Sequence, residues 1–355
     1  MTPTLYNTEY FGPLFYGKKT KELVKWIPLG AFVLLDHEDI DEMAAISLIQ
    51  KKVKGVLNLA SSMSGKYASI GTRRLIQANI PVYDLVTKSK LMDEISQGEI
   101  IHISDNRLWV EGRDTALCPL DPYTEQKIEA KILESKKRIA ESLGIFTRNT
   151  LDYASKELDM ILGPISLPPL KTNMKNRYVL VVTRGSGYID DLQALSSFIK
   201  DKQPILMGVD GGADAILECG YKPDVIIGDM DSISEKALLS GAEVIVHAYP
   251  NGEAPGLKIV EKLGVASHLF PCFGTSEDAA HLLAYESGAL LIVTLGSHTN
   301  VVDFFEKGRK GMGSTLLVRL KVGDKLIDAK GISHLFPENA KIRYLSKVRS
   351  ILGLL

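Results

Sequence analysis

Short apolar runs alternate with amphipathic stretches through the first third of the chain. The apolar runs are predicted strands, and they cover residues 31–35, 55–59 and 81–85. Between them, residues 40–51 and 71–78 carry apolar positions at helical spacing. Two further short strands, 99–103 and 107–110, flank a turn-forming Ser-Asp-Asn segment. This pattern predicts a smaller N-terminal α/β domain over residues 1–120, built on a small sheet with a β-hairpin.

A long amphipathic helix is predicted over residues 121–163. Asp121 is a good N-cap residue, Pro122 suits the first helical position, and Gly163 with a following proline marks the end. Apolar residues recur close to the helical period at Ile128, Ile132, Ile139, Leu143, Phe146, Leu151, Ala154, Leu158 and Ile161. At about 1.5 Å per residue the helix would extend on the order of 60 Å, unless Gly144 divides it. We expect its stripe to be buried between the domains or against a second copy of the chain.

After a proline-containing linker at residues 164–176, strand-like and helical segments alternate regularly. The strand-like runs are 178–183, 205–209, 225–227, 243–246 and 290–295. The helical stretches lie near 190–200, 213–219, 234–239 and 277–286. This alternation predicts a doubly wound, Rossmann-like parallel sheet over residues 177–335. Ligands of such sheets bind at the carboxyl ends of the strands, where this chain has Arg184, Gly185, Asp210, Gly211, Gly212, Gly228, Asp229, Gly296, Ser297 and His298.

Two of these strand ends carry grouped carboxylates. Asp210 precedes two glycines, which let the backbone approach a ligand closely, although a tight strand-to-helix turn would use the same residues. Asp224, Asp229 and Asp231 fall within eight positions around the next strand. Hard oxygen ligands of this kind suit Mg²⁺ carrying the phosphates of a nucleotide. Asp231 or Ser232 is also expected to cap the following helix.

Composition and charge exclude several classes of protein. With 355 residues the chain is long enough for two domains, and its 42 basic and 43 acidic residues nearly cancel. A nucleic-acid partner is therefore not expected. The three cysteines form no CxxC pair, which argues against a disulfide framework or a zinc site. We found neither a signal-like start nor a long apolar run, so the expected location is the cytoplasm.

Three polar or basic segments leave alternatives open. The tail, residues 336–355, mixes basic and apolar residues, which fits a helix packed on its own domain or one that lies on a membrane surface or a partner. The loop 58–67 is rich in hydroxyls and contains Lys66, which fits an ordinary polar loop or an anion site. Arg309 and Lys310 lie among glycines, in a loop that would close over phosphates or form a solvated turn. The histidines His247, His281 and His298 are expected to be structural more often than catalytic.

In combination, Asp210 with its two glycines, the Pro-Asp pair before the next strand and the segment 228–232 resemble the catalytic domain of thiamin pyrophosphokinases. The resemblance implies a homodimer that moves a diphosphate from ATP to a primary alcohol and releases AMP. It also implies that Asp210, Asp229 and Asp231 hold Mg²⁺ and the phosphates of ATP or another nucleotide. Downstream, segment 274–281 keeps Thr275, Ser276 and Asp278 of the family pattern, but its lysine is absent, as is an arginine expected in 296–303.

The residue pattern and the resemblance to thiamin pyrophosphokinases together define the predicted site. Its catalytic residues are Asp210, Asp229, Asp231 and Asp278, of which the first three are also the metal ligands. The nucleotide is expected to contact Arg184, Gly185, Gly211, Gly212, Ser232, Thr275, Ser276, Gly296, Ser297 and His298. Because the lysine and the arginine are missing, thiamin is expected to be a poor substrate.

Over nearly its whole length the chain resembles SteA-like proteins of Gram-positive bacteria, a family linked to the cytokinetic ring and the cell envelope. The matching segments are 64–67, 209–214, 228–232, 246–250, 254–257, 274–278, 307–312 and 322–330. This resemblance implies a nucleotide-responsive scaffold in cell division or envelope growth, with a division or membrane protein as partner and a peripheral location. The N-terminal domain is also similar to the swivelling phosphohistidine domain, but segment 64–70 lacks the histidine which that family uses.

Overall fold

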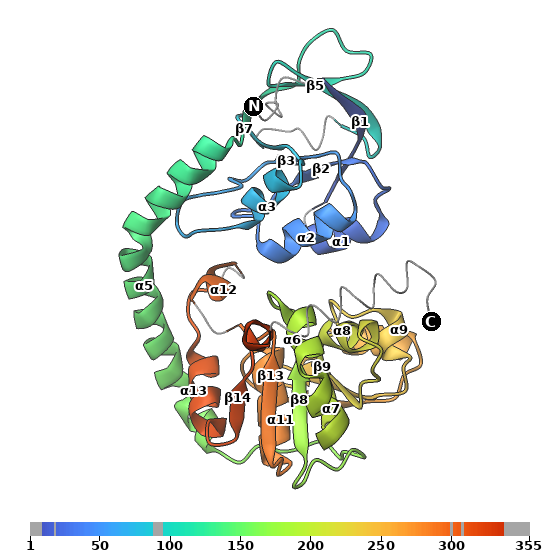
Figure 1. Ribbon diagram of the computed structural model, residues 1–355, viewed down its shortest axis with the longest axis vertical. Coiled ribbons are helices and arrows are strands. Elements are labelled where there is room, and N and C mark those ends of the chain that lie inside the picture. Colours follow the sequence, from blue (N-terminus) through green and yellow to red (C-terminus); the bar gives the residue numbers. More distant parts are fainter. Residues whose placement is uncertain (1–8, 18, 88–94, 299–300, 307–308, 337–355) are drawn as a thin grey trace. The chain divides into compact units, whose positions relative to one another are not determined.

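The computed structural model describes residues 9–17, 19–87, 95–298, 301–306 and 309–336 (Figure 1). The chain divides into two compact units. The first comprises residues 1–147 and 300–310, and the second comprises residues 148–299 and 311–355. The predicted tail helix lies outside the described residues, except for Phe336. None of the helices within the described ranges is both long enough and apolar enough to cross a membrane.

The first unit contains a closed seven-stranded barrel. In order around the barrel the strands are β1 (Tyr10–Tyr16), β2 (Phe32–Leu35), β3 (Gly55–Asn58), β4 (Val82–Leu85), β7 (Cys118–Pro122), β6 (Arg107–Val110) and β5 (Glu99–Ser104). The predicted hairpin is confirmed, because β5 and β6 pair antiparallel. The predicted small sheet was wrong, because the strands close into a barrel. Strand β1, which was not predicted, pairs with β2 in parallel and with β5 antiparallel, so neither strand is left as an edge.

Apolar side chains fill the barrel on the inside and attach a helical layer on the outside. The inner cluster includes Leu14, Phe32, Leu57 and Ile101, which are fully buried. The outer cluster lies between the strands and the helices α1 (Thr20–Trp26), α2 (Glu42–Gln50) and α3 (Gly71–Gln77). Strands β2, β3 and β4 are therefore covered on both sides, as expected for β-strands that read as continuous apolar runs.

Helix α5 (Glu125–Leu162) is continuous through Gly144 and is drawn in green in Figure 1. It begins later than predicted, because Asp121 and Pro122 belong to β7 and pair with Asp84 and Tyr83 of β4. The apolar stripe is only partly covered within the chain. Phe146 is buried, with its ring 5.8 and 5.3 Å from the rings of Phe304 and Phe305 in α12 (Val301–Glu306). Four stripe residues remain exposed, namely Ile139, Leu143, Leu151 and Leu158.

The second unit is built on a seven-stranded sheet in which every neighbouring pair is parallel. Its strand order is β12 (Ser267–Pro271), β11 (Glu243–Ala248), β10 (Val225–Gly228), β9 (Ile205–Val209), β8 (Tyr178–Val182), β13 (Leu291–Leu295) and β14 (Leu326–Asp328). The chain runs outward from β8 to β12 and then returns to place β13 on the other side of β8. The edge strands β12 and β14 are partly exposed, β14 has only three residues, and the sequence analysis predicted neither strand.

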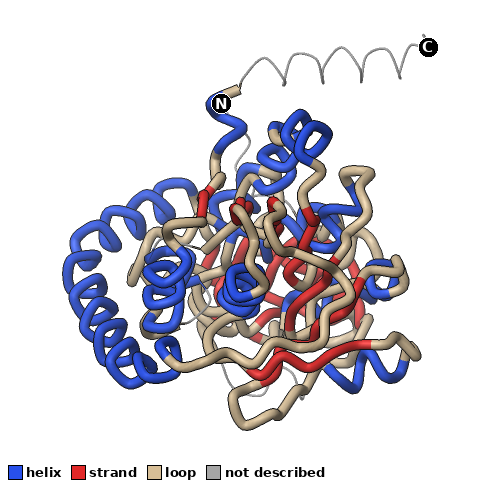
Figure 2. Tube along the Cα trace, turned by 90° about the horizontal axis from the view of Figure 1, so that it is seen from below, coloured by secondary structure: helices blue, strands red, loops and turns tan. Residues whose placement is uncertain are grey.

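Both faces of this sheet are covered by helices, as the blue segments around the red strands in Figure 2 indicate. The helices are α6 (Tyr188–Ala194), α7 (Ser196–Lys202), α8 (Gly212–Glu218), α9 (Glu235–Leu238), α10 (Leu257–Lys262), α11 (Ser276–Glu286) and α13 (Gly313–Val322), followed by the 3₁₀ turn η1 (Ile332–Leu335). Alternate residues of β8 enter different apolar clusters. Val179 and Val181 pack with residues of α11 and α13, whereas Leu180 and Val182 pack on the opposite face.

Candidate active site

Asp210 lies at the carboxyl end of β9, half-buried against the end of β10. Its Oδ1 accepts a hydrogen bond of 2.9 Å from the amide of Met230, and its own amide donates to the carbonyl of Ile227. Gly228 lies directly beside this carboxylate, and a Cβ at that position would overlap Asp210 Oδ1. Only glycine therefore allows the ends of β9 and β10 to meet in this way.

Asp229 and Asp231 are exposed and belong to the same group of carboxylates. The amide of Asp231 donates to Asp229 Oδ1 at 3.1 Å. Burial raises the pKa of Asp210 to about 7, and the negative charges of Asp229 and Asp231 act in the same direction. Hydrogen bonds from the Met230 amide and the Ser276 side chain work against this shift. The structure therefore brings the three predicted carboxylates together, with Ser276 beside them.

This group fits a divalent cation by its chemistry. The negative charges of Asp229 and Asp231 raise the pKa of Asp210, and a hard cation with oxygen ligands would relieve this repulsion. Among the residues that the structure describes, no three His, Cys, Asp or Glu side chains already stand in a metal-binding arrangement. Asp229 and Asp231, which are exposed, are the members of the group best able to turn toward an ion.

Asp224 has a different role from the one that its sequence position suggested. It precedes β10, so it lies at the amino end of that strand, and its Oδ2 accepts a hydrogen bond of 2.8 Å from the amide of Leu206 at the start of β9. The sequence analysis grouped it with Asp229 and Asp231, and this was wrong. A four-residue strand separates its side chain from the end at which Asp229 follows.

Arg184 and the glycines around it shape the same edge of the sheet. Arg184 Nη2 donates a hydrogen bond of 2.9 Å to the carbonyl of Ser232, which ties the end of β8 to the loop after β10. Gly211 lies beneath this guanidinium, and a Cβ there would overlap it. Gly185 and Gly296 lie against each other at the ends of β8 and β13. Gly212 similarly lies against the Val182 carbonyl. The glycines predicted to contact the nucleotide therefore allow at least the close packing of these strand ends.

The residues at the start of α11 are engaged in a capping box. The Thr275 hydroxyl accepts from the Asp278 amide, and Asp278 Oδ2 accepts from the Thr275 amide at 2.8 Å and from the hydroxyl of Thr315 at 2.9 Å. Burial raises the pKa of Asp278 to about 6. The predicted catalytic residue Asp278 thus holds the helix start in place, while its neighbour Ser276 reaches Asp210.

Ser297 and His298 contact two acidic residues that sequence reasoning did not select. The buried hydroxyl of Ser297 donates to both carboxylate oxygens of Asp328 at 2.9 Å. The amide of His298 donates to Glu277 Oε2 at 3.3 Å, and its ring Nδ1 lies 3.6 Å from the same oxygen. Glu277 and Asp328 lie in segments 274–278 and 322–330, and the resemblance to SteA-like proteins expected for these segments was the one signal that could have drawn attention to them.

The pKa of Asp210 leads to a prediction about stability. An acid whose folded pKa is about 7, against an ordinary 3.8, stabilises the fold fully below about pH 4 and loses that contribution as the pH rises to about 7. Asp210→Asn removes the charge and is expected to raise the free energy of unfolding at pH 8 by about 1 to 3 kcal/mol, and by much less near pH 5. Urea unfolding at both pH values measures this. An equal gain at both pH values would contradict the assignment.

A second polar group lies in the first unit, around the hydroxyl-rich loop 58–67. Buried Asp39 accepts hydrogen bonds of 2.6 Å from both the amide and the hydroxyl of Ser64, and Asp84 accepts from the hydroxyls of Ser62 and Tyr123. Burial raises the pKa of Asp39 and of Asp84. Since these serine hydroxyls already donate to carboxylates, the structure favours the ordinary polar loop over an anion site.

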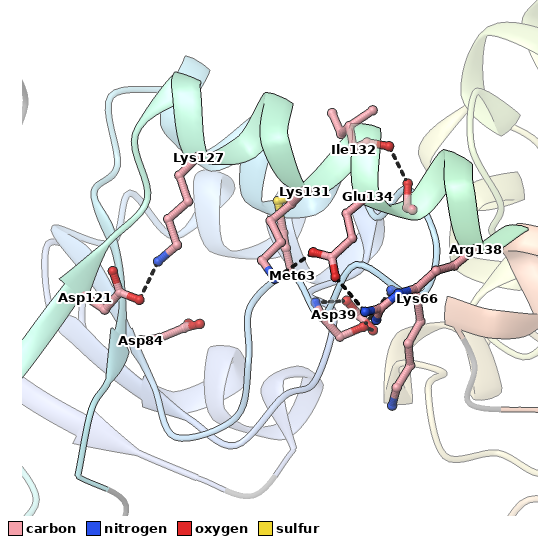
Figure 3. Close-up of polar contacts among 12 residues, drawn as sticks. Asp39, Met63, Lys66, Asp84, Asp121, Lys127, Lys131, Ile132, Glu134 and Arg138 are labelled. Atoms are coloured by element: carbon pink, nitrogen blue, oxygen red, sulfur yellow. Dashed lines mark hydrogen bonds and ion pairs between the residues drawn. The ribbon is translucent and has the colours of Figure 1, made fainter.

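Helix α5 holds the same loop from outside. The Gly65 backbone is left-handed, which favours glycine, and a Cβ there would also lie 2.8 Å from Glu134 Oε2, so that this side chain would have to move. Figure 3 shows Glu134 between Lys131 and Arg138, its ion-pair partners at 3.1 and 2.9 Å, with Lys66 close by. The hydroxyl of Ser142 in α5 also donates to the carbonyl of Lys66 at 3.5 Å, so the loop packs against this helix.

Comparison with known families agrees with the geometry of the second unit. The profile of the thiamin pyrophosphokinase catalytic domain matches residues 197–251. This segment runs from α7 to the end of β11 and includes Asp210, Gly228, Asp229 and Asp231. The second unit therefore contains a thiamin pyrophosphokinase-like domain within a mixed α/β protein.

Three similar solved structures align with parts of this chain at low sequence identity. Thiamin pyrophosphokinase from Geobacillus thermodenitrificans is 19% identical over 42% of this chain and 58% of its own, with a TM-score of 0.28. Thiamine pyrophosphokinase from Bacillus subtilis is 21% identical over 43% of this chain and 60% of its own, with a TM-score of 0.27. The match therefore spans about three fifths of either kinase. The 3-isopropylmalate dehydratase from Methanocaldococcus jannaschii is 14% identical over 38% of this chain and 98% of its own, with a TM-score of 0.25. No curated protein matches the sequence.

Proposed function

We propose that the second unit binds a magnesium nucleotide and transfers a diphosphate from ATP to an alcohol. The observation that carries this proposal is the carboxylate group of Asp210, Asp229 and Asp231 at neighbouring strand ends, inside the segment that matches the kinase profile. We also class the sheet as doubly wound and Rossmann-like, because helices cover both faces and the strand order reverses between β8 and β13. In such sheets the ligand binds where the order reverses.

The residues of this chain would act mainly by positioning charge. Asp210, Asp229 and Asp231 would hold Mg²⁺. The bound ion would shield the negative charge of the phosphates. Arg184 lies at the same edge, and its contact with the Ser232 carbonyl keeps a guanidinium near the loop that carries the carboxylates. No carboxylate is needed as a base in this scheme, since holding the alcohol in line with the phosphorus is the main task.

Two measurements test the proposal in sequence. Calorimetric titration with Mg-ATP and Mg-GTP tests binding, and chromatography of AMP after incubation of Mg-ATP with a panel of alcohols tests transfer. Saturable binding and alcohol-dependent AMP release are the expected results. The proposal fails if neither nucleotide binds to the full chain.

The second candidate is a nucleotide-responsive scaffold of SteA-like type that binds without turnover. It is supported by the absent lysine and arginine in segments 274–281 and 296–303, and by the burial of Asp278 in a capping box. This candidate carries the further proposals of a homodimer, a division or membrane protein partner and a peripheral location at the division site. Binding of Mg-ATP without release of AMP in the presence of any alcohol favours the scaffold over the enzyme.

Thiamin is expected to be at best a poor substrate. The side chains at the end of β13 are Ser297 and His298, and they are engaged with Asp328 and Glu277 rather than presenting a free cation. We expect AMP release with thiamin to stay within a few-fold of the rate without any alcohol. Robust, thiamin-dependent AMP release at micromolar thiamin would contradict this prediction.

A further inference from the structure

His247 of β11 lies beside the carboxylate group. Strands β10 and β11 pair in parallel up to Gly228 and Val246, so the next residues along the two segments, Asp229 and His247, are neighbours at the carboxyl ends. The negative charge of Asp229 acts on the His247 ring. The imidazole therefore belongs to the same edge of the sheet as the predicted metal ligands.

His247 and the carboxylate group are also connected through α11. His247 is two residues beyond Ile245 in β11, so both side chains lie on the face of the sheet that α11 covers. The side chain of Ser276, the first residue of α11, hydrogen-bonds to Asp210. Helix α11 thus begins beside the carboxylate group on the face to which the imidazole belongs.

One ring nitrogen of His247 is held by the backbone. Nε2 lies 3.1 Å from the carbonyl oxygen of Cys272. Because a carbonyl oxygen only accepts, Nε2 carries the proton, and the neutral ring has its lone pair on Nδ1. Burial lowers the pKa of His247, which favours this neutral form at pH 7, although the Cys272 carbonyl and the charge of Asp229 act in the opposite direction.

The second ring nitrogen, Nδ1, is available to a ligand. Among the described residues, none hydrogen-bonds to this nitrogen, and it is not enclosed, in contrast to both ring nitrogens of His281. Its lone pair can accept but cannot donate. An imidazole that donates one N–H to a backbone carbonyl and offers its other nitrogen as a ligand is the arrangement common to histidines that bind metal ions.

The groups at this edge of the sheet restrict the ligand that they can share. Asp229 and Asp231 offer carboxylate oxygens and His247 offers a nitrogen lone pair, so all three are electron-pair donors. A phosphate alone would be repelled by the carboxylates, and a hydroxyl would donate to only one of the three groups. A divalent cation can bind all of them, and the exposed Asp229 and Asp231 side chains can turn toward it.

We propose that His247 Nδ1 is a further ligand of the cation held by the carboxylate group, and that this site takes a divalent first-row transition-metal ion. The inference rests on the metal site of the proposed function and specifies its ion. Mg²⁺ is bound mainly by oxygen ligands, whereas imidazole nitrogen is a ligand of transition metals. Loss of this nitrogen therefore weakens the binding of a transition-metal ion more than it weakens the binding of Mg²⁺.

The first experiment detects the nitrogen directly, with Mn²⁺ as the probe because this ion also accepts carboxylate oxygens. Electron spin-echo envelope modulation of bound Mn²⁺ is recorded on the untagged full chain, prepared with ordinary and with nitrogen-15-labelled histidine. We expect a nitrogen coupling that changes with the isotope and disappears in His247→Gln. Glutamine keeps a donor for the Cys272 carbonyl and removes the nitrogen lone pair. His268→Gln, at a partly exposed position of the neighbouring strand β12, is the matched control and should retain the coupling.

The second experiment compares affinities for the metal ions alone by titration calorimetry with manganese and magnesium chloride. His247→Gln is expected to bind Mn²⁺ at least about tenfold more weakly than wild type, with the affinity for Mg²⁺ within about threefold. Urea unfolding of the same samples shows whether the variant is folded. His247→Asn replaces it should glutamine destabilise the chain.

The outcomes separate this inference from the proposed function. If Mn²⁺ binds with the nitrogen coupling of His247 but Mg-ATP does not bind, the nucleotide proposal fails and the inference about the metal ion stands. If Mn²⁺ binds without a coupling that depends on His247, or does not bind to the chain, the inference is overturned whether or not Mg-ATP binds.

Discussion

Asp229→Asn and Asp231→Asn are each expected to weaken Mg-ATP binding by about 100-fold or more, with little change in stability. Both side chains are exposed, so an amide of the same size disturbs no packing. Each change removes a hard, charged oxygen ligand from the group around Asp210. Loss of one ligand from a phosphate-bound Mg²⁺ site costs several kcal/mol, far above the roughly 0.5 kcal/mol usual for an exposed substitution.

Isothermal titration calorimetry at neutral pH measures the affinity, and urea unfolding measures the stability of the same samples. Asp201→Asn is the matched control, because Asp201 is an exposed carboxylate in α7, within the same kinase-like segment but outside the carboxylate group. Its affinity for Mg-ATP should equal that of wild type. If wild type binds Mg-ATP and both site variants bind as tightly, the carboxylates do not carry the metal and the proposed site is wrong.

Phe146→Ala is expected to lower the free energy of unfolding of the first unit by about 3 to 5 kcal/mol. Phe146 is 4% exposed, and its ring packs against Phe304 and Phe305 of α12. Removing the ring leaves a cavity and removes the apolar contact that joins α12, which is distant in sequence, to α5. Urea unfolding followed by circular dichroism measures the loss.

Leu143→Ala provides the control on the same helix. Leu143 is 45% exposed, so within the monomer its replacement should cost no more than about 0.5 kcal/mol. A larger cost at Leu143 that depends on protein concentration would indicate that a second copy covers it, in line with the proposed homodimer. A cost below about 1 kcal/mol at Phe146 would contradict its place in the core.

The alternation of apolar runs and helical stretches determined much of the second unit in advance. Strand and helix periods are local properties, so the sequence indicated β8, β9, β10, β11 and β13 and the glycine-rich ends that follow them. The match of residues 197–251 confirmed the kinase-like character read from Asp210 and segment 228–232. For Gly228, the sequence shows its place before Asp229, but only the structure shows its contact with Asp210.

Only the tertiary structure shows how the strands of the first unit close into a barrel and which partners the buried polar side chains have. Strand β1 closes the barrel because it finds two partners, β2 and β5, that lie about 15 and 80 residues away, and no local pattern encodes such pairing. Asp224 lies at the opposite end of β10 from Asp229 because a strand separates positions that are close in sequence. The ion pair between Glu277 of α11 and Arg319 of α13 likewise forms only when the two helices pack on the same face of the sheet, so neither segment alone predicts it.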